Sequence, residues 1–252
     1  MAGINISLEV FSILLSFLLF CSCLAEAMRK KNVVRRIFTA MLIVNCLVLI
    51  SDMITWIFEG AVEYTVFLYA CNFLVYSLGY VITGLYTWYL VFYISEKKRV
   101  PVIIGYIVSA LCLIAVLLVV ISLFNHMYFR FEDGIYMRGK YYWISQIYPV
   151  FILFFNMIIV FHYRKQLGVH DTMALLSYGV LPICAMLIQI ALYGITLLYI
   201  STTFSLLIIF ISIHVKQGRN LSRREEELKS ANISLMVSQI QPHFLTNLLT
   251  AI

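Results

Sequence analysis

The sequence predicts an all-α membrane protein with about seven transmembrane helices, followed by a cytoplasmic helix. Of the 252 residues, 63% are hydrophobic and 12% are charged, whereas a soluble domain carries about 25% charged residues. This excess of apolar side chains requires a lipid bilayer around most of the chain. The net charge of +6 resides in short basic stretches between apolar runs. That pattern is typical of membrane topology and does not indicate nucleic-acid binding.

Seven apolar runs are long enough to cross a bilayer, for which a helix needs about 20 residues. They are Ile4–Ala25, Ile37–Phe58, Thr65–Ile94, Val100–Phe124, Ile144–Tyr163, Ala174–Tyr193 and Ile195–Val215. The first run has no basic segment before it, so we expect a retained span and not a cleaved signal peptide. Only a turn near Gly194 separates the last two runs. The transmembrane region is therefore expected to cover residues 1–215.

The basic residues predict the orientation of this region. Most of them lie in alternate connections, at Arg29–Arg36, Glu96–Arg99 and Arg164–Lys165, or after Val215. The other connections hold only three Lys or Arg residues. Basic loops remain in the cytoplasm. We therefore expect the N-terminus outside and the C-terminus inside, which also requires an odd number of spans.

Polar residues inside the spans are costly and are therefore candidate functional residues. Asp52, Thr55 and Glu59 share one helical face, and residues of the third span repeat at steps of three and four. The candidates for sensing a ligand are Glu9, Asp52, Tyr69, Asn72, Tyr76 and Gln189. Two interpretations stay open. These residues line an outward-opening pocket for a small polar or cationic ligand, or they form hydrogen bonds between helices that fix the bundle.

Residues 216–238 are polar and charged and are predicted to form a cytoplasmic helix. Leu221, Leu228 and Leu235 recur every seven residues, as in one seam of a two-stranded coiled coil. Arg224 falls at a core position of the same repeat and weakens it. A parallel homodimer through this helix and a solvated single helix are both compatible with the pattern.

The segment "QIQPHFLTNLL" (Gln239–Leu249) follows that helix. It resembles the phosphoacceptor motif of the LytS/YesM-like family of bacterial sensor histidine kinases, written Q-[IMV]-x-P-H-F-L-[FY]-N-x-L. The matching residues are Gln239, Ile240, Pro242, His243, Phe244, Leu245, Asn247 and Leu249. Thr246 departs from the motif, which has an aromatic residue at that position.

The resemblance implies that the chain is the membrane sensor of a two-component system in the bacterial plasma membrane. His243 would take the γ-phosphoryl group of ATP and pass it to an aspartate of a response regulator, because a neutral imidazole offers the attacking lone pair. Asn247 lies one turn further on the same face and would support this step. Residues 239–252 would begin the phosphoacceptor domain. ATP and Mg²⁺ are expected only through an ATP-binding domain that this sequence lacks, so the chain alone would be inactive; no metal site is expected.

The alternative is a polytopic transporter or membrane-embedded enzyme whose tail matches the motif by chance. Transporters commonly show internal repeats and broken helices, and the sequence shows no repeat. A retinal-binding protein would need a lysine within a span, and no predicted span contains one.

Overall fold

The computed structural model describes residues 2–29, 32–192, 195–215 and 222–237. Contacts within the chain separate two units, Met1–Ile209 and Phe210–Ile252.

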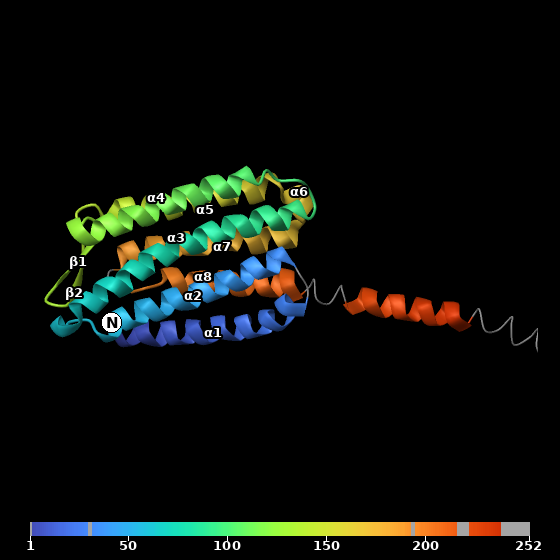
Figure 1. Cartoon of the computed structure of the whole chain (residues 1–252), viewed down its shortest axis with the longest axis horizontal. Helices are drawn as coiled ribbons and strands as arrows, with labels where there is room; N and C mark the ends of the chain where they lie inside the picture. Colours follow the sequence, from blue (N-terminus) through green and yellow to red (C-terminus); the bar gives the residue numbers. More distant parts are fainter. Residues whose placement is uncertain (1, 30–31, 193–194, 216–221, 238–252) are drawn as a thin grey trace, which may run out of the picture. The chain divides into compact units, whose positions relative to one another are not determined.

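The first unit is a helical bundle (Figure 1). Its six long helices are α1 (Ala2–Arg29), α2 (Val33–Ile57), α3 (Thr65–Ser95), α4 (Ile103–Asn125), α5 (Tyr142–His162) and α7 (Val169–Ala191). Its shorter elements are the 3-10 turn η1 (Val62–Tyr64), α6 (Arg164–Leu167) and α8 (Leu198–Ile209). The six long helices are long and apolar enough to cross a membrane. Six of the seven expected spans therefore have such a helix in the part of the chain that the structure describes.

The helix found in the seventh predicted span, Ile195–Val215, begins later than predicted. Helix α8 begins at Leu198, three residues after the predicted start, and has 12 residues. In the sequence it is followed by a π-helical segment, Phe210–Val215. Residues 195–197 are not helical. Before α8, Thr196 N donates to Asn5 Oδ1 (3.2 Å) and Leu197 N donates to Gln189 Oε1 (3.4 Å), so side chains satisfy N–H groups that have no partner within the helix.

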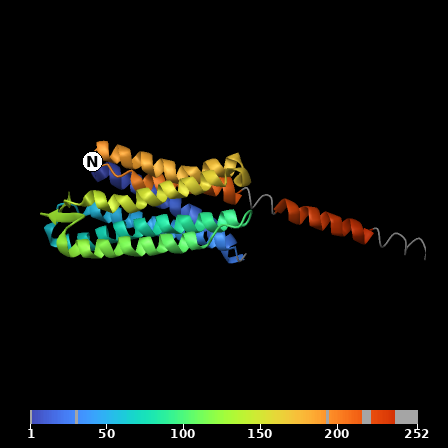
Figure 2. The same cartoon turned by 90° about the horizontal axis from the view of Figure 1, so that it is seen from above.

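Helix α3 packs against α2, α4 and α5, while α8 packs against α7, α1 and α2 (Figures 1 and 2). The aromatic side chains of α3 fill much of the interior. Tyr86 and Tyr89 are almost completely buried. The Tyr86 hydroxyl donates to Leu175 O (2.6 Å), and its ring stacks on that of Tyr178 with 3.9 Å between the centroids. These contacts connect α3 to α7 near the middle of the bundle.

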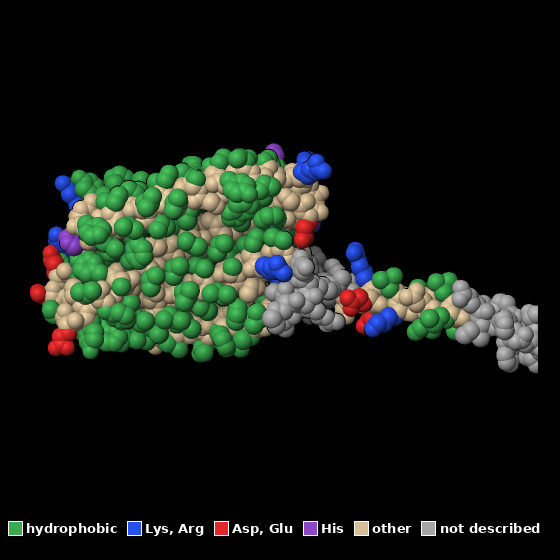
Figure 3. All heavy atoms as spheres, in the orientation of Figure 1, with side chains coloured by type: hydrophobic (Ala, Val, Ile, Leu, Met, Phe, Trp, Pro, Cys, Tyr) green, Lys and Arg blue, Asp and Glu red, His purple; other side chains and the backbone are tan. Residues whose placement is uncertain are grey.

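The outer surface of the bundle is apolar over most of the face in view, and its charged side chains gather at the two ends (Figure 3). Many large hydrophobic side chains are exposed, among them Phe17, Leu113 and Ile158. An exposed apolar surface of this extent is stable in lipid and not in water.

The connection between α4 and α5 contains a β-hairpin, which the all-α prediction did not include. Strands β1 (Phe129–Glu132) and β2 (Ile135–Arg138) pair antiparallel around Asp133 and Gly134. Both turn residues have positive φ angles, 50° and 76°. An Asp-Gly pair with two positive φ angles is the turn that two-residue hairpins favour.

The second unit contains a helix over residues 222–237, which we call the tail helix. Every residue of the tail helix is exposed. Arg223 and Glu227 form an ion pair one turn apart, with Nε and Oε1 separated by 3.1 Å. Leu228 and Leu235 of the expected seam lie on this helix, and Leu221 lies outside the described residues. The dimeric coiled coil stays a prediction.

Candidate functional site

A cavity of about 440 Å³ lies inside the first unit. Its wall is formed by residues of α2, α3, β2, α5, α7 and α8, by Ala2 at the start of α1, by Glu59 in the turn after α2, and by the non-helical residues Ile195 and Thr196 before α8. Ala2, Glu59 and Arg138 belong to the wall, so the cavity occupies the half of the bundle that holds the start of α1 and the hairpin (Figure 1). Sites for small molecules commonly have volumes of about 300–1,000 Å³. The cavity is large enough for such a ligand.

Four of the six candidate residues line the cavity: Asp52, Asn72, Tyr76 and Gln189. Glu9 and Tyr69 are not in the wall. Glu9 is buried next to Asp52. The Tyr69 hydroxyl accepts a hydrogen bond from Phe131 N (3.2 Å) of the hairpin.

The acidic side of the cavity is formed by α2 and the turn that follows it. Asp52 and Thr55 lie on one face of α2, as their helical spacing predicts. Glu59 also lines the cavity, but it lies in the turn beyond Ile57, where α2 ends, and not on the predicted helical face. Trp56 belongs to the same face, and its Nε1 atom is buried with no hydrogen-bond partner among the described residues. A buried donor of this kind is costly unless a ligand or water accepts from it.

The carboxyl groups of Glu9 and Asp52 interact with each other where α1 meets α2. Glu9 is 1% exposed, and its Oε1 atom accepts a hydrogen bond from Thr196 Oγ1 (2.9 Å). Its Oε2 atom meets no donor among the described residues. Two acidic side chains that lie near each other repel when both are charged.

The hairpin closes one side of the cavity. Tyr136 and Arg138 of β2 line it. The hydroxyl groups of Tyr136 and Tyr76 are 2.9 Å apart, and the Arg138 guanidinium lies 4.7 Å from the ring centroid of Tyr142. The turn of the hairpin is fixed by a backbone hydrogen bond from Gly60 N to Gly134 O (3.0 Å).

Tyr199 of α8 reaches the cavity because α3 has a glycine opposite it. The Tyr199 hydroxyl donates to Val75 O (3.1 Å). A Cβ atom on Gly79 would lie 2.6 Å from the Tyr199 hydroxyl oxygen. Val75, Gly79 and Tyr199 all line the cavity, so this close approach connects the cavity to α8.

Sequence reasoning missed several residues of the wall, including Trp56, Tyr136, Arg138 and Tyr199. The Asp133–Gly134 pair between short alternating strands was the available signal for the hairpin, and hence for Tyr136 and Arg138. Trp56 and Tyr199 carry no comparable signal, because an aromatic residue in an apolar span is ordinary.

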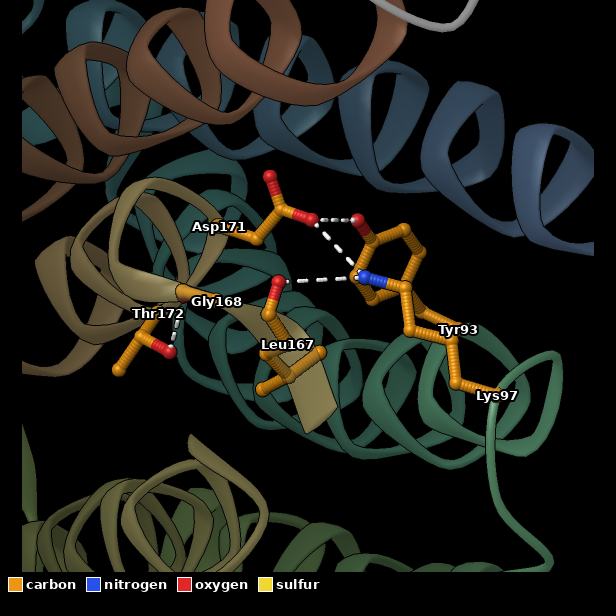
Figure 4. Close-up of polar contacts among 6 residues, drawn as sticks. All are labelled: Tyr93, Lys97, Leu167, Gly168, Asp171 and Thr172. Carbon is orange, nitrogen blue, oxygen red and sulfur yellow. Dashed lines mark hydrogen bonds and ion pairs between the residues drawn. The ribbon is translucent and has the colours of Figure 1, made fainter. Parts of the chain in front are cut away.

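A second polar cluster lies at the opposite end of the bundle, between α3 and α7 (Figure 4). Asp171 Oδ2 accepts hydrogen bonds from the Tyr93 hydroxyl (2.8 Å) and from Lys97 Nζ (3.1 Å). Lys97 Nζ also donates to Leu167 O (3.2 Å). Asp171 is in the first turn of α7, where a negative charge is favourable. We call the side chains of Tyr93, Lys97 and Asp171 the α3–α7 clasp. Sequence reasoning missed this cluster.

The residues of the expected phosphoacceptor motif, Gln239, Pro242, His243, Phe244, Leu245 and Asn247, lie outside the described residues. No family model, curated protein or solved structure matches the chain.

Proposed function

We propose that this chain is the membrane sensor region of a two-component histidine kinase, together with the beginning of its phosphoacceptor domain. The observation that carries the proposal is the segment Gln239–Leu249, in which eight of eleven positions agree with the LytS/YesM-like motif. The motif follows a charged helix that follows a set of apolar helices, which is the order a membrane sensor kinase requires.

The proposed topology has seven spans, with the N-terminus outside and the tail in the cytoplasm of a bacterial cell. Residues 198–215 supply the seventh span in this scheme. The scheme is supported by the distribution of Lys and Arg, since the connections after α1, α3 and α5 are basic. The cavity and hairpin would then face the cell exterior, and the α3–α7 clasp would lie at the cytoplasmic side.

The cavity supports a sensing role for the bundle. A ligand inside it would touch α2, α3, α5, α7 and the start of α8 at once. Ligand binding would thereby favour one arrangement of these helices over another, which is the requirement for a change of state. Helix α8 leads in sequence to the tail helix and to His243, so its position would carry the signal.

The catalytic proposal concerns His243 and Asn247. His243 would attack the γ-phosphorus of ATP, and the phosphoryl group would then pass to an aspartate of a response regulator. ATP and Mg²⁺ would be bound by a separate ATP-binding domain and not by this chain. The tail helix would form the homodimer that presents His243 to that domain.

A transporter remains the alternative, and one observation favours it. Pro149 and Pro182 lie inside α5 and α7 and both belong to the cavity wall. Proline inside a helix frees a backbone carbonyl, and interrupted helices surround the substrate sites of many transporters. Uptake of a cavity ligand into proteoliposomes that contain this chain would support the transporter and contradict the sensor.

The test of the kinase proposal is phosphorylation of the protein that includes the ATP-binding domain, with ATP labelled at its γ-phosphate. The expected result is acid-labile, base-stable phosphate on His243. It should vanish in His243→Gln and persist in the control His170→Gln, which alters an exposed histidine at the start of α7. Normal labelling of His243→Gln would overturn the assignment.

A further inference from the structure

We propose that the cavity binds a small organic cation, with the ammonium group beside Asp52 and its apolar part against the surrounding aromatic rings. This inference rests on the proposed sensing role of the cavity and names the class of ligand that it takes.

The charges of the wall favour a cation. Asp52 and Glu59 contribute carboxyl groups to the wall, and the buried carboxyl group of Glu9 lies near Asp52. Among the described residues that line the cavity, Arg138 is the only Lys or Arg, and its guanidinium is placed over the ring of Tyr142. Asp52 has no Lys or Arg partner in the described part of the chain. A bound ammonium group would provide the missing positive charge.

The aromatic residues of the wall favour an organic cation over a hydrated metal ion. The rings come from α2, α3, β2, α5, α7 and α8, and they are Trp56, Tyr76, Tyr80, Tyr136, Tyr142, Tyr178 and Tyr199. The face of an aromatic ring attracts ammonium groups, and tryptophan does so most strongly. Trp56 lies one helical turn from Asp52 on the same face of α2, so one ligand can contact both.

The neutral polar groups limit the alternatives. Asn72, Gln189 and Thr55 line the cavity and can bond an ammonium or a hydroxyl group. Two carboxyl groups against one guanidinium make the wall repulsive to an anion. The combination of size, rings and carboxyl groups therefore fits an aralkyl amine better than a sugar, a phosphate or a carboxylic acid.

The first experiment measures binding of three probes of closely similar shape to the full chain in lipid nanodiscs, with empty nanodiscs to subtract partition into lipid. The probes are 2-phenylethylamine, which is a cation, 2-phenylethanol, which is neutral, and phenylacetate, which is an anion. We expect the cation to bind at least tenfold more tightly than either of the others. Equal binding of the cation and the alcohol, or preference for the anion, would overturn the proposal.

The second experiment locates the site. Asp52→Asn should reduce the preference for the cation over the alcohol at least tenfold. Glu63→Gln is the matched control, because Glu63 is an acidic residue in η1 that does not line the cavity, and it should leave the preference unchanged. Trp56→Leu, which keeps Asp52, should weaken cation binding severalfold. This variant tests the same site if Asp52→Asn does not fold. An unchanged preference in the folded cavity variants would place the cation elsewhere and contradict the inference.

These binding measurements require no phosphorylation. If the cation fails to bind while His243 is labelled by ATP, the kinase proposal stands and the ligand class is wrong. If the cation binds while His243 stays unlabelled, the ligand class stands and the kinase proposal fails.

Discussion

The hydroxyl groups of Tyr76 and Tyr136 lie 2.9 Å apart and join α3 to strand β2 at the wall of the cavity. Removing one hydroxyl, in Tyr136→Phe, keeps the ring but loses this hydrogen bond. We expect a loss of about 0.5–1.5 kcal/mol in the free energy of unfolding and faster hydrogen exchange of the hairpin amides. The double variant Tyr76→Phe/Tyr136→Phe should cost less than the sum of the two single changes.

The control for this pair is Tyr64→Phe, because the hydroxyl of Tyr64 makes no hydrogen bond with the described residues. It should leave hairpin exchange unchanged. If the two single changes were strictly additive, the two hydroxyl groups would not be hydrogen-bonded in the protein.

The turn of the hairpin approaches the α2–α3 connection so closely that only glycine fits. Gly134 has a φ of +76°, and a Cβ atom there would lie 2.9 Å from Gly60 C and Ala61 N. Gly60 also has a positive φ, +84°, but a Cβ atom on it would meet nothing within 4 Å. Gly60→Ala should therefore lower the free energy of unfolding only by the strain of placing alanine in the left-handed conformation, about 1–2 kcal/mol. Gly134→Ala should lower it further and displace the hairpin. Equal losses in thermal unfolding of the two variants would show that the close approach does not exist.

The contacts of Glu9 predict that the bundle tolerates one substitution at this position and is destabilised by another. Glu9→Gln keeps an oxygen to accept from Thr196 Oγ1 and adds an amide donor for Asp52, so the free energy of unfolding should change by less than about 0.5 kcal/mol. Glu9→Met has a similar shape but leaves the Thr196 hydroxyl without its acceptor, which should cost about 1–3 kcal/mol. Chemical unfolding in detergent micelles measures both, and a glutamine variant as unstable as the methionine variant would show that the hydrogen bond from Thr196 Oγ1 does not stabilise the bundle.

The α3–α7 clasp divides into a strong and a weak contact. Asp171→Leu removes the acceptor of the buried Tyr93 hydroxyl and should cost about 1–3 kcal/mol. Lys97 is 38% exposed, so solvent screens its ion pair; Lys97→Met should cost less than about 1 kcal/mol, and less again at high salt. Lys165→Met is the matched control at the same end of the bundle. If Lys97→Met lowered the free energy of unfolding as much as Asp171→Leu does, the clasp would be stabilised mainly by the ion pair and not by the Tyr93 hydrogen bond.

The helices could be predicted from sequence because length and hydropathy alone decide whether a segment is stable across a bilayer. The start of α8 could not, since the segment before it bonds to Asn5 and Glu9, which are distant in the chain, and to Gln189 of α7. The hairpin was missed because the search for apolar runs overlooks strands of four residues.

The candidate site was predictable in part for a related reason. Helical periodicity places Asp52, Asn72 and Tyr76 on inward faces, and all three line the cavity. Periodicity does not tell how far along the helix a cavity extends, so Tyr69 was grouped with them although it contacts the hairpin. Gly79 and Tyr199 depend on the packing of α3 against α8, which no local pattern records.

Sensor control of His243 requires that the bundle and the phosphoacceptor histidine be joined by a rigid helix. The most direct test is phosphate incorporation on His243, in the protein that includes the ATP-binding domain, after insertion of one, four or seven residues behind Arg224 in the tail helix. One residue rotates everything beyond it by about 100° and should lock or abolish labelling, while seven residues restore the same face of a coiled coil and should preserve it. Equal labelling with one, four and seven inserted residues would show a flexible tether and contradict the proposed coupling.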